Sequence, residues 1–265
     1  MIISLIGVGK MGSALLKGWL KAGMEKEKIV IYDKNPLALE PFKGRAEFAP
    51  NCTSAIEKAD VVVFAVKPKE LLPLLDEVGG FLKGKIAISI AAGVSLEQLA
   101  KRASAKWVRA MPNIACEVGE GFIAIAGEQE GLEIAEELFQ LTGKVMRVEE
   151  NLMDAITALS GSGPGFVSLL IDAIADGGVK IGLPKELSLL ITAQTFLGTA
   201  SLLLSSSKHP VELKDAVCSP AGTTIAGIST MEKAGLRGIL MMGIEETYRR
   251  AKELQREAEN EDTAR

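Results

Sequence analysis

Short runs of β-branched and other apolar residues alternate with helical patterns through the first half of the chain, and this alternation constrains the fold most. One run, Asp60–Val66, is apolar at every position after its first residue. A strand without polar alternation is buried on both faces, as in a parallel sheet that helices cover from either side. We therefore predict an α/β fold with a Rossmann-type parallel sheet. The predicted strands are Ile2–Ile6, Lys28–Tyr32, Asp60–Val66, Lys85–Ile90, Lys106–Ala110 and Gly121–Ala126.

Near residue 150 the pattern changes to helices alone. Two stretches there, Ala155–Ile171 and Leu187–Ser207, contain no charged residue. The second is long enough to span a bilayer, but its many serines and threonines favour a helix buried nearly all round. A helical domain of ~115 residues has too small an interior to bury both stretches. We therefore expect a sheet domain over residues 1–150 and an all-α dimerisation domain over residues 151–265, which a second copy of the chain covers.

The charged and reactive residues exclude several kinds of chemistry. Lysine and arginine number 30 against 34 acidic residues, so the net charge is −4, which argues against nucleic-acid and anionic-membrane surfaces. With one histidine, His209, the chain cannot build a histidine-rich zinc site, and we expect no metal centre. Three separated cysteines are typical of free thiols in a reducing compartment, and the first residues show no secretion signal, so we expect a cytoplasmic protein. A reaction here would take its reactive group from a cofactor.

A glycine-rich turn follows the first predicted strand and opens a helix, which is the context that dinucleotide-binding fingerprints require. Gly7 permits a tight turn, Gly9 lets a pyrophosphate approach the backbone, and Gly12 lets the helix lie close to the strand. The helix N-terminus adds ~0.3–1 kcal/mol of attraction for an anion. A turn without a ligand is the alternative. The predicted cofactor-binding residues of this turn are Gly7, Val8, Gly9, Lys10, Met11 and Gly12.

Two neighbouring residues give opposite indications about the cofactor. Asp33 ends the second predicted strand, where an acid usually holds the ribose 2′-hydroxyl of NAD and repels a 2′-phosphate. Lys34 follows at once and could pair with that phosphate. Asp33 could also simply face solvent. The sequence therefore leaves NADPH and NADH both open.

Further cofactor contacts are expected at the ends of two later strands, because ligands of open parallel sheets bind beyond the carboxyl ends of the strands. These segments should line the nicotinamide side, although Lys67 could equally be an ordinary solvated lysine. The residues are Ala65, Val66, Lys67 and Pro68 in one loop and Ala92 and Gly93 in the other.

A loop with several hydroxyls, Cys218–Gly227, precedes a helix in the second half. Backbone N–H groups, hydroxyl donors and a helix dipole end together suit a small carboxylate. A helix capped by Thr223 or Thr224 would explain the same residues without a ligand.

Several motifs in order along the chain resemble pyrroline-5-carboxylate reductases. They are Ser160–Pro164, Asp176–Pro184, His209–Pro210, Leu213–Asp215 and Ser219–Ile225, with Gly7–Gly12, Ala65–Pro68 and Met111–Asn113 in the first half. The resemblance implies NAD(P)H-dependent reduction of L-1-pyrroline-5-carboxylate to L-proline, the last step of proline biosynthesis, with NADPH as the usual cofactor. It also implies helices that interleave in a homodimer or in a larger assembly such as a decamer.

The resemblance and the loop chemistry together suggest roles for individual residues. We expect a substrate carboxylate to bind Ser219, Ala221, Gly222, Thr223 and Thr224. By resemblance, Thr224 is the candidate catalytic contact to the ring nitrogen, and Pro112 and Asn113 belong to the cofactor site. The chain departs from the family at Ala221, where glycine is usual, at Gly165-Phe166 in place of Ala-Tyr, and at Ile114-Ala115 in place of Thr-Pro.

Two other functions use part of the same pattern. A β-hydroxyacid dehydrogenase shares the glycine-rich turn but needs a catalytic lysine in its helical domain, where Lys180 is the only nearby candidate. A non-catalytic dinucleotide sensor would not need the hydroxyls of the loop Cys218–Gly227. His209 precedes Pro210 at a predicted helix start, which favours a structural role.

Overall fold

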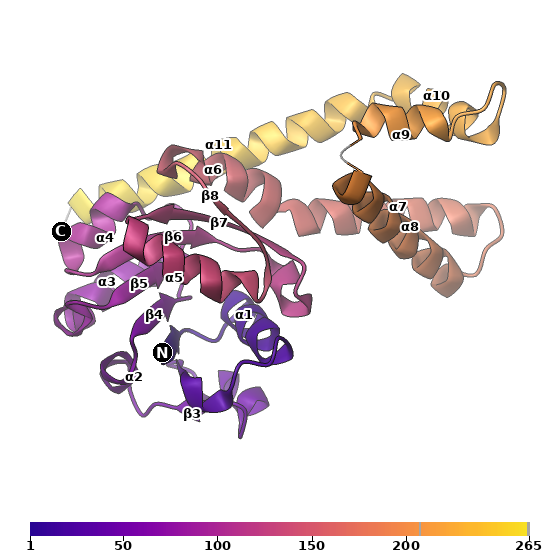
Figure 1. The fold of residues 1–265 in the computed structure, drawn as a ribbon. Coiled ribbons are helices and arrows are strands. Elements are labelled where there is room, and N and C mark those ends of the chain that lie inside the picture. Colours follow the sequence, from indigo (N-terminus) through magenta and orange to yellow (C-terminus); the bar gives the residue numbers. More distant parts are fainter. Residues whose placement is uncertain (207, 264–265) are drawn as a thin grey trace. The chain divides into compact units, whose positions relative to one another are not determined.

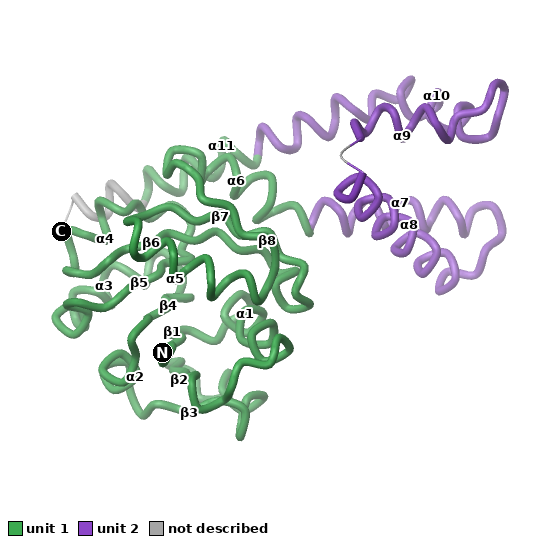
Figure 2. Tube along the Cα trace, in the orientation of Figure 1, with its two compact units in different colours: residues 1–164, 247–265 green, residues 165–246 purple. Residues whose placement is uncertain are grey.

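A computed structural model describes residues 1–206 and 208–263, with the side chains of residues 258–263 left aside. The chain divides into two compact units (Figure 2). The first unit contains residues 1–164 together with the end of the chain from Thr247, and the second contains Gly165–Glu246. The boundary expected at residue 150 separates a cofactor-binding domain from a substrate-binding domain. The division into compact units does not test those roles, so this boundary stays a prediction.

The first unit contains an eight-stranded sheet in the order β3-β2-β1-β4-β5-β6-β7-β8 (Figure 1, with β1 and β2 labelled in Figure 2). Neighbouring strands are parallel except for β6 and β7, which are antiparallel. This confirms the predicted Rossmann-type sheet. The strands are β1 (Ile3–Ile6), β2 (Ile29–Tyr32), β3 (Glu47–Phe48), β4 (Val61–Phe64), β5 (Ile86–Ser89), β6 (Lys106–Met111), β7 (Gly121–Gly127) and β8 (Gly143–Arg147).

Each of the six predicted segments coincides with a strand to within two residues at either end, whereas β3 and β8 were not predicted. Both lie at an edge of the sheet. β3 has two residues, too few for a pattern. β8 reads Gly-Lys-Val-Met-Arg and is mostly exposed, so it lacks the apolar run of an interior strand. A sequence pattern that depends on burial does not detect such edges.

Helices cover both faces of the sheet, and two apolar clusters form the core. Val61 and Val63 of β4 pack in one cluster with side chains of α1 and α5. Val62 and Phe64 pack in the other with α2, α3 and α4. Burial on both faces explains why β4 is apolar throughout. The helices of this unit are α1 (Lys10–Lys21), α2 (Cys52–Lys58), α3 (Pro68–Val78), α4 (Leu96–Arg102), α5 (Gln129–Gln140) and α6 (Met153–Ile156), followed by a π-helical turn, η7 (Thr157–Gly161).

The second unit is helical, and few of its side chains are buried within the chain. In α8, Ser188 and Thr192 are the buried residues, and Leu190, Leu197 and Leu204 are exposed. This low burial agrees with the expectation that the helical domain is too small to bury both uncharged stretches within one chain, and cover by a second copy stays a prediction. The helices are α7 (Gly163–Lys180), α8 (Lys185–Ser206), α9 (Pro210–Ala216), α10 (Thr223–Lys233) and α11 (Leu236–Thr263), whose later part belongs to the first unit.

Two helical stretches, Glu150–Lys180 and Lys185–Ser206, meet the length and hydropathy of a membrane span, and 11% of the most apolar 18-residue window in each is buried within the chain. Length and composition alone are weak grounds for a membrane helix, since they fit an apolar helix covered by another protein surface equally well.

Candidate functional site

The turn between β1 and α1 is built by two glycines with different neighbours. At Gly7, φ is +96°, and a Cβ atom there would lie 2.8 Å from the carbonyl carbon of Ala65. At Gly12, a Cβ atom would lie 2.2 Å from the carbonyl oxygen of Gly7. These two positions therefore hold the turn against the loop after β4 and hold α1 against the turn. Any side chain at either position would force the backbone apart.

Gly9 differs because a Cβ atom there would meet no heavy atom within 4 Å. Gly9 is also the N-cap residue of α1, and it has no side chain to accept the first N–H groups of the helix. The helix therefore begins with amide donors directed at open space, the arrangement that binds phosphate. The residues suit the pyrophosphate of a dinucleotide.

Asp33 is fixed by two backbone donors. Its Oδ2 accepts the N–H of Val8 at 2.7 Å, and its Oδ1 accepts the N–H of Asn35 at 2.8 Å. The side chain thus connects the end of β2 with the glycine-rich turn. The alternative that Asp33 simply faces solvent is therefore wrong. Lys34 points outward with 75% of its side chain exposed and forms a 3.1 Å ion pair with Glu70.

A cleft of about 610 Å³ lies at the carboxyl ends of β1, β2 and β4. It brings together seven of the predicted cofactor residues: Gly7, Gly9, Asp33, Lys34, Ala65, Val66 and Lys67. Val8, Lys10, Met11, Gly12 and Pro68 lie in the same two turns and helix starts without lining the cleft. Sequence reasoning missed Cys52, Lys69, Glu70 and Glu77 on its walls. The i,i+3 spacing from Lys67 could have indicated Glu70.

Cys52 begins α2 and faces this cleft. Burial, and after it the charge of Glu77, raises the pKa of the Cys52 thiol to about 11. Burial also raises the pKa of the Cys116 thiol. Both thiols are therefore neutral near pH 7, and all three cysteines are free, as expected for a chain without a disulfide framework.

The loop after β5 lines a different and smaller cavity, of about 170 Å³, within the first unit. Ala92 and Gly93 face side chains of α6, η7 and the later part of α11 there, among them Asp154, Thr157 and Arg250. At Gly93, φ is +75°, and a Cβ atom would lie 3.2 Å from the Cα of Gln255. The later part of α11 therefore packs directly on this loop.

Asn113 connects the end of β6 to the π-helical turn. Its Nδ2 donates to the carbonyl oxygen of Ser160 at 3.3 Å and to the Ser160 hydroxyl at 3.2 Å, and its Oδ1 accepts the N–H of Ala115. π-helical turns are rare and occur frequently at functional sites. Pro112 precedes Asn113 and is buried. These two predicted cofactor residues therefore lie in a braced loop beside η7.

The hydroxyl-rich loop of the second unit ends at the start of α10. Gly222 is the N-cap residue, so the alternative of a helix capped by Thr223 or Thr224 is wrong. Both threonines are exposed in the first turn of α10, and the N–H of Gly222 donates to the carbonyl oxygen of Ser219 at 3.0 Å. The first amides of the helix and the threonine hydroxyls are thus available to a small anion.

Ala221 has a left-handed backbone with φ of +55°, the one positive φ outside glycine in the described part of the chain. A residue with a Cβ atom adopts this conformation at a cost of about 1–2 kcal/mol. The structure therefore gives a physical meaning to the departure at this position, because glycine would adopt the same turn without strain.

His209 is the N-cap residue of α9, and its Nδ1 accepts the N–H of Val211 at 3.2 Å. This contact confirms the predicted structural role. Within the described residues, no group of three or more histidine, cysteine, aspartate or glutamate side chains could hold a metal ion.

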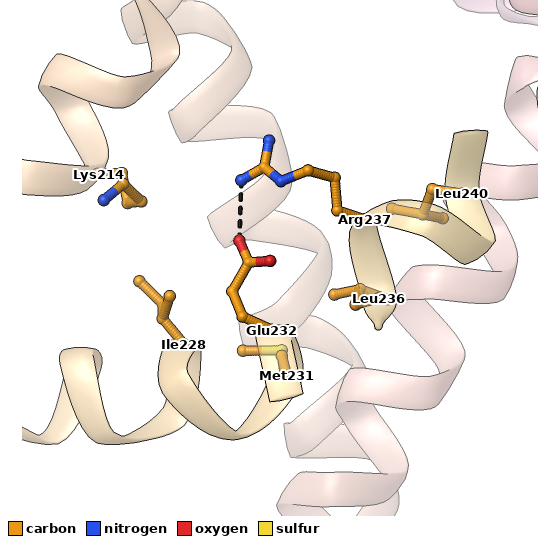
Figure 3. A pocket seen from close by; sticks show the side chains of 7 residues that line it. All are labelled: Lys214, Ile228, Met231, Glu232, Leu236, Arg237 and Leu240. Carbon is orange, nitrogen blue, oxygen red and sulfur yellow. Dashed lines mark hydrogen bonds and ion pairs between the residues drawn. The ribbon is translucent and has the colours of Figure 1, made fainter. Parts of the chain in front are cut away.

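A mainly apolar pocket of about 340 Å³ lies among α9, α10 and α11 in the second unit (Figure 3). No sequence pattern indicated this pocket. Its charged residues are Lys214 and the pair Glu232 and Arg237, which form a 2.8 Å ion pair. The pocket is lined by Lys214, Ile228, Met231, Glu232, Leu236, Arg237 and Leu240.

The mostly parallel sheet with a glycine-rich turn facing a cleft defines a Rossmann-type dinucleotide-binding protein that carries an additional helical unit. Residues 150–254 match the family described as pyrroline-5-carboxylate reductase dimerisation, and residues 2–93 match the NADP oxidoreductase coenzyme F420-dependent family. Pyrroline-5-carboxylate reductase of Methanosarcina acetivorans is 41% identical over 95% of this chain and 97% of its own length. The Pisum sativum reductase is 38% identical over 95% of both chains.

Solved structures agree with these matches. The pyrroline carboxylate reductase of Plasmodium falciparum, with NADP bound, has a TM-score of 0.87 and 29% identity, over 96% of this chain and 98% of that one. The Streptococcus pyogenes reductase has a TM-score of 0.82 and 34% identity, over 96% and 98%. The chain therefore belongs to the pyrroline-5-carboxylate reductase family. A 3-hydroxyisobutyrate dehydrogenase of Mycobacterium tuberculosis, at a TM-score of 0.51 and 16% identity, shares the fold alone over 69% of this chain and 67% of its own.

The two glycines of the turn predict opposite outcomes for the same substitution. Gly9→Ala should fold with the wild-type melting temperature and lose affinity for NADPH, because its methyl group would occupy only open space where a pyrophosphate approaches. Gly12→Ala should lose stability by about 1–3 kcal/mol, because its methyl group meets the Gly7 carbonyl. Thermal unfolding and binding calorimetry measure both. Normal NADPH binding by Gly9→Ala would contradict the assignment of the turn.

Proposed function

We propose that the protein is a pyrroline-5-carboxylate reductase, which reduces L-1-pyrroline-5-carboxylate to L-proline in the last step of proline biosynthesis. The observation that carries this proposal is similarity at 38–41% identity over 95% of the chain to proteins of that name. The two local features that the reaction needs support it. One is a glycine-rich turn that opens on a cleft, and the other is a hydroxyl-rich helix start.

The cofactor that we propose is NADPH, with NADH as the alternative hydride donor. A bound reduced nicotinamide dinucleotide supplies the hydride. The open amides around Gly9 suit the pyrophosphate, and Asp33 and Lys34 lie where an adenosine ribose is held in such folds. Lys10, Met11 and Gly12 continue that turn into α1. Ala65, Val66, Lys67 and Pro68, with Ala92, Gly93, Pro112 and Asn113, would line the remainder of the site.

For the substrate, we propose that the loop before α10 binds the carboxylate. Its donors are the N–H groups of Ala221, Thr223 and Thr224 and the hydroxyls of Ser219, Thr223 and Thr224, all near the positive end of the helix dipole, while the N–H of Gly222 closes the turn onto the Ser219 carbonyl. Gly222 keeps the loop close, because a Cβ atom there would lie 2.2 Å from the Ser219 hydroxyl. The Thr224 hydroxyl is the proposed contact to the ring nitrogen.

This set of residues holds the substrate and performs little proton chemistry. A cyclic imine that is protonated on nitrogen is already electrophilic, so the protein needs no strong acid or base. The one histidine, His209, caps α9 through its Nδ1, which agrees with a reaction that needs no catalytic acid or base. Correct placement of two reactants can supply up to ~7–11 kcal/mol of the barrier. Positioning by the carboxylate loop is therefore the principal contribution that we assign to these residues.

We also propose that the protein acts in the cytoplasm as a homodimer or a larger assembly such as a decamer. The exposed apolar residues of α8 and the apolar pocket among α9, α10 and α11 favour contact with another protein surface. A second copy of the chain fits this surface better than lipid, because serine and threonine are frequent along α8. The net charge of −4 gives no support to a nucleic-acid partner.

The direct test is oxidation of NADPH and of NADH after addition of L-1-pyrroline-5-carboxylate, followed by the loss of reduced-nicotinamide absorbance. We expect L-proline to form in equal amount to the cofactor consumed, with NADPH the faster donor. A purified, folded protein without activity toward either cofactor would overturn the proposal. A 3-hydroxyacid with the oxidised cofactor serves as the control for the dehydrogenase alternative.

Lys34→Ala should lower kcat/KM for NADPH by up to about tenfold, which corresponds to 1.4 kcal/mol, and leave the value for NADH unchanged. The reason is that Lys34 can leave its exposed pairing with Glu70 for a 2′-phosphate, which NADH lacks. Steady-state kinetics with both cofactors measure the ratio. Lys26→Ala, at an exposed lysine that pairs with Glu27, is the matched control. Equal losses with both cofactors would show that Lys34 does not recognise the phosphate.

Thr224→Ala should lower kcat/KM for the imine about 10- to 100-fold and leave the affinity for NADPH unchanged, since a hydrogen bond to a charged group contributes about 1.5–3 kcal/mol. Thr230→Ala is the control, because that hydroxyl lies in the same helix and donates to its own backbone at Ala226. Kinetics and cofactor calorimetry on both variants distinguish the two. Near-normal turnover of Thr224→Ala would exclude the proposed contact.

A further inference from the structure

The loop that connects β5 with α4 is held at both of its ends. At its start, the N–H of Ala91 donates to the Ser89 hydroxyl at 3.2 Å. At its end, Ser95 caps α4 in a reciprocal capping box with Gln98. The N–H of the next residue, Leu96, donates to Glu150 Oε1 at 2.7 Å, across 54 residues of sequence. Ala92 and Gly93, the two proposed nicotinamide-side residues, lie between these fixed points.

Glu150 is itself fixed by a buried cation. The same Oε1 atom accepts from Arg109 Nη1 at 2.8 Å. The Arg109 side chain is 6% exposed, the lowest value for a cation in the ion pairs of the described residues. A buried guanidinium is strongly destabilising without an anion, so Arg109 holds the carboxylate in place. Arg109 is in β6, where it pairs with Ser89 of β5, the residue that anchors the start of the loop.

Glu150 also occupies a particular place in the chain. It is the first residue of the short helical turn η6 (Glu150–Leu152), which leads from the sheet into α6 and the π-helical turn η7. One carboxylate oxygen thus joins the last residues of the β5–α4 loop, a buried arginine of the sheet and the segment that precedes the helices. Asn113, just after β6, makes a second contact of this kind, because its side chain donates to the Ser160 hydroxyl of η7.

We infer that Glu150 is a positioning residue for the nicotinamide end of the cofactor site, acting through the N–H of Leu96 and oriented by Arg109. This inference rests on the proposed dinucleotide binding. The adenosine end, at β1 and β2, lies on the other side of β4 from β5 in the sheet. Loss of the Glu150 carboxylate would therefore release the loop around Ala92 and Gly93 and leave the adenosine end in place.

The test compares two ligands in the same variant. Glu150→Ala should bind NADPH at least about tenfold more weakly than wild type, whereas adenosine 2′,5′-bisphosphate, which has no nicotinamide half, should bind unchanged. Glu150→Gln retains an oxygen acceptor for Leu96 and should recover part of the NADPH affinity. Calorimetry measures both ligands, at a temperature where circular dichroism shows every variant folded. If Glu150→Ala does not fold, the same comparison on Glu150→Gln decides.

The control is Asp76→Asn, which removes a carboxylate that accepts from Arg102 Nη1 at 2.6 Å on the surface of the same unit. Both ligands should bind this variant as they bind wild type. Equal weakening of NADPH and adenosine 2′,5′-bisphosphate in the Glu150 variants, or no change in either, would overturn the inference. Failure of the wild-type protein to bind NADPH would instead overturn the proposed cofactor and would be seen before any variant is measured. Binding of NADPH without turnover of the imine would overturn the proposed reaction and leave the positioning role intact.

Discussion

Burial of both faces of β4 is the constraint on which the first unit depends. Val61 and Val63 face one apolar cluster, and Val62 and Phe64 face the other. Helices must therefore cover the sheet on both sides, and polar groups can gather only where the strands end. The cleft at the ends of β1, β2 and β4 follows from this arrangement, since the loops there are the exposed backbone nearest to the sheet.

The glycine-rich turn after β1 lies at this end of the sheet, and close backbone contacts hold it in place. Gly7 and Gly12 permit contacts that no side chain would tolerate, with the Ala65 carbonyl in one case and the Gly7 carbonyl in the other. These contacts bring α1 and the loop after β4 against the turn, and Asp33 adds two hydrogen bonds that fix its position. Gly9 is then left open at the start of α1. A rigid surround and an exposed helix N-terminus are together what an anion site requires.

The second unit has the opposite character, because its helices bury little within one chain. Glycine and serine bring α7 and α8 together at Gly178 and Ser188, whose hydroxyl donates to the Ala175 carbonyl. Beyond that contact, apolar side chains of α8 are exposed. The loop before α10 contains the strained Ala221 beside hydroxyls and free helix amides. Strain of this kind is maintained where the surrounding structure requires one conformation, as at ligand-binding loops.

The sequence by itself determined the interior strands, the glycine-rich turn and the hydroxyl-rich loop before α10, because burial period, turn chemistry and helix-start chemistry depend on neighbouring residues. Tertiary structure alone decided the edge strands β3 and β8 and the antiparallel placement of β7, since edge strands carry little apolar pattern. It also decided that Ala92 and Gly93 line a cavity separate from the one at Gly9. The contact between Glu150 and Leu96 crosses 54 residues, and only the fold brings two such groups within hydrogen-bond distance.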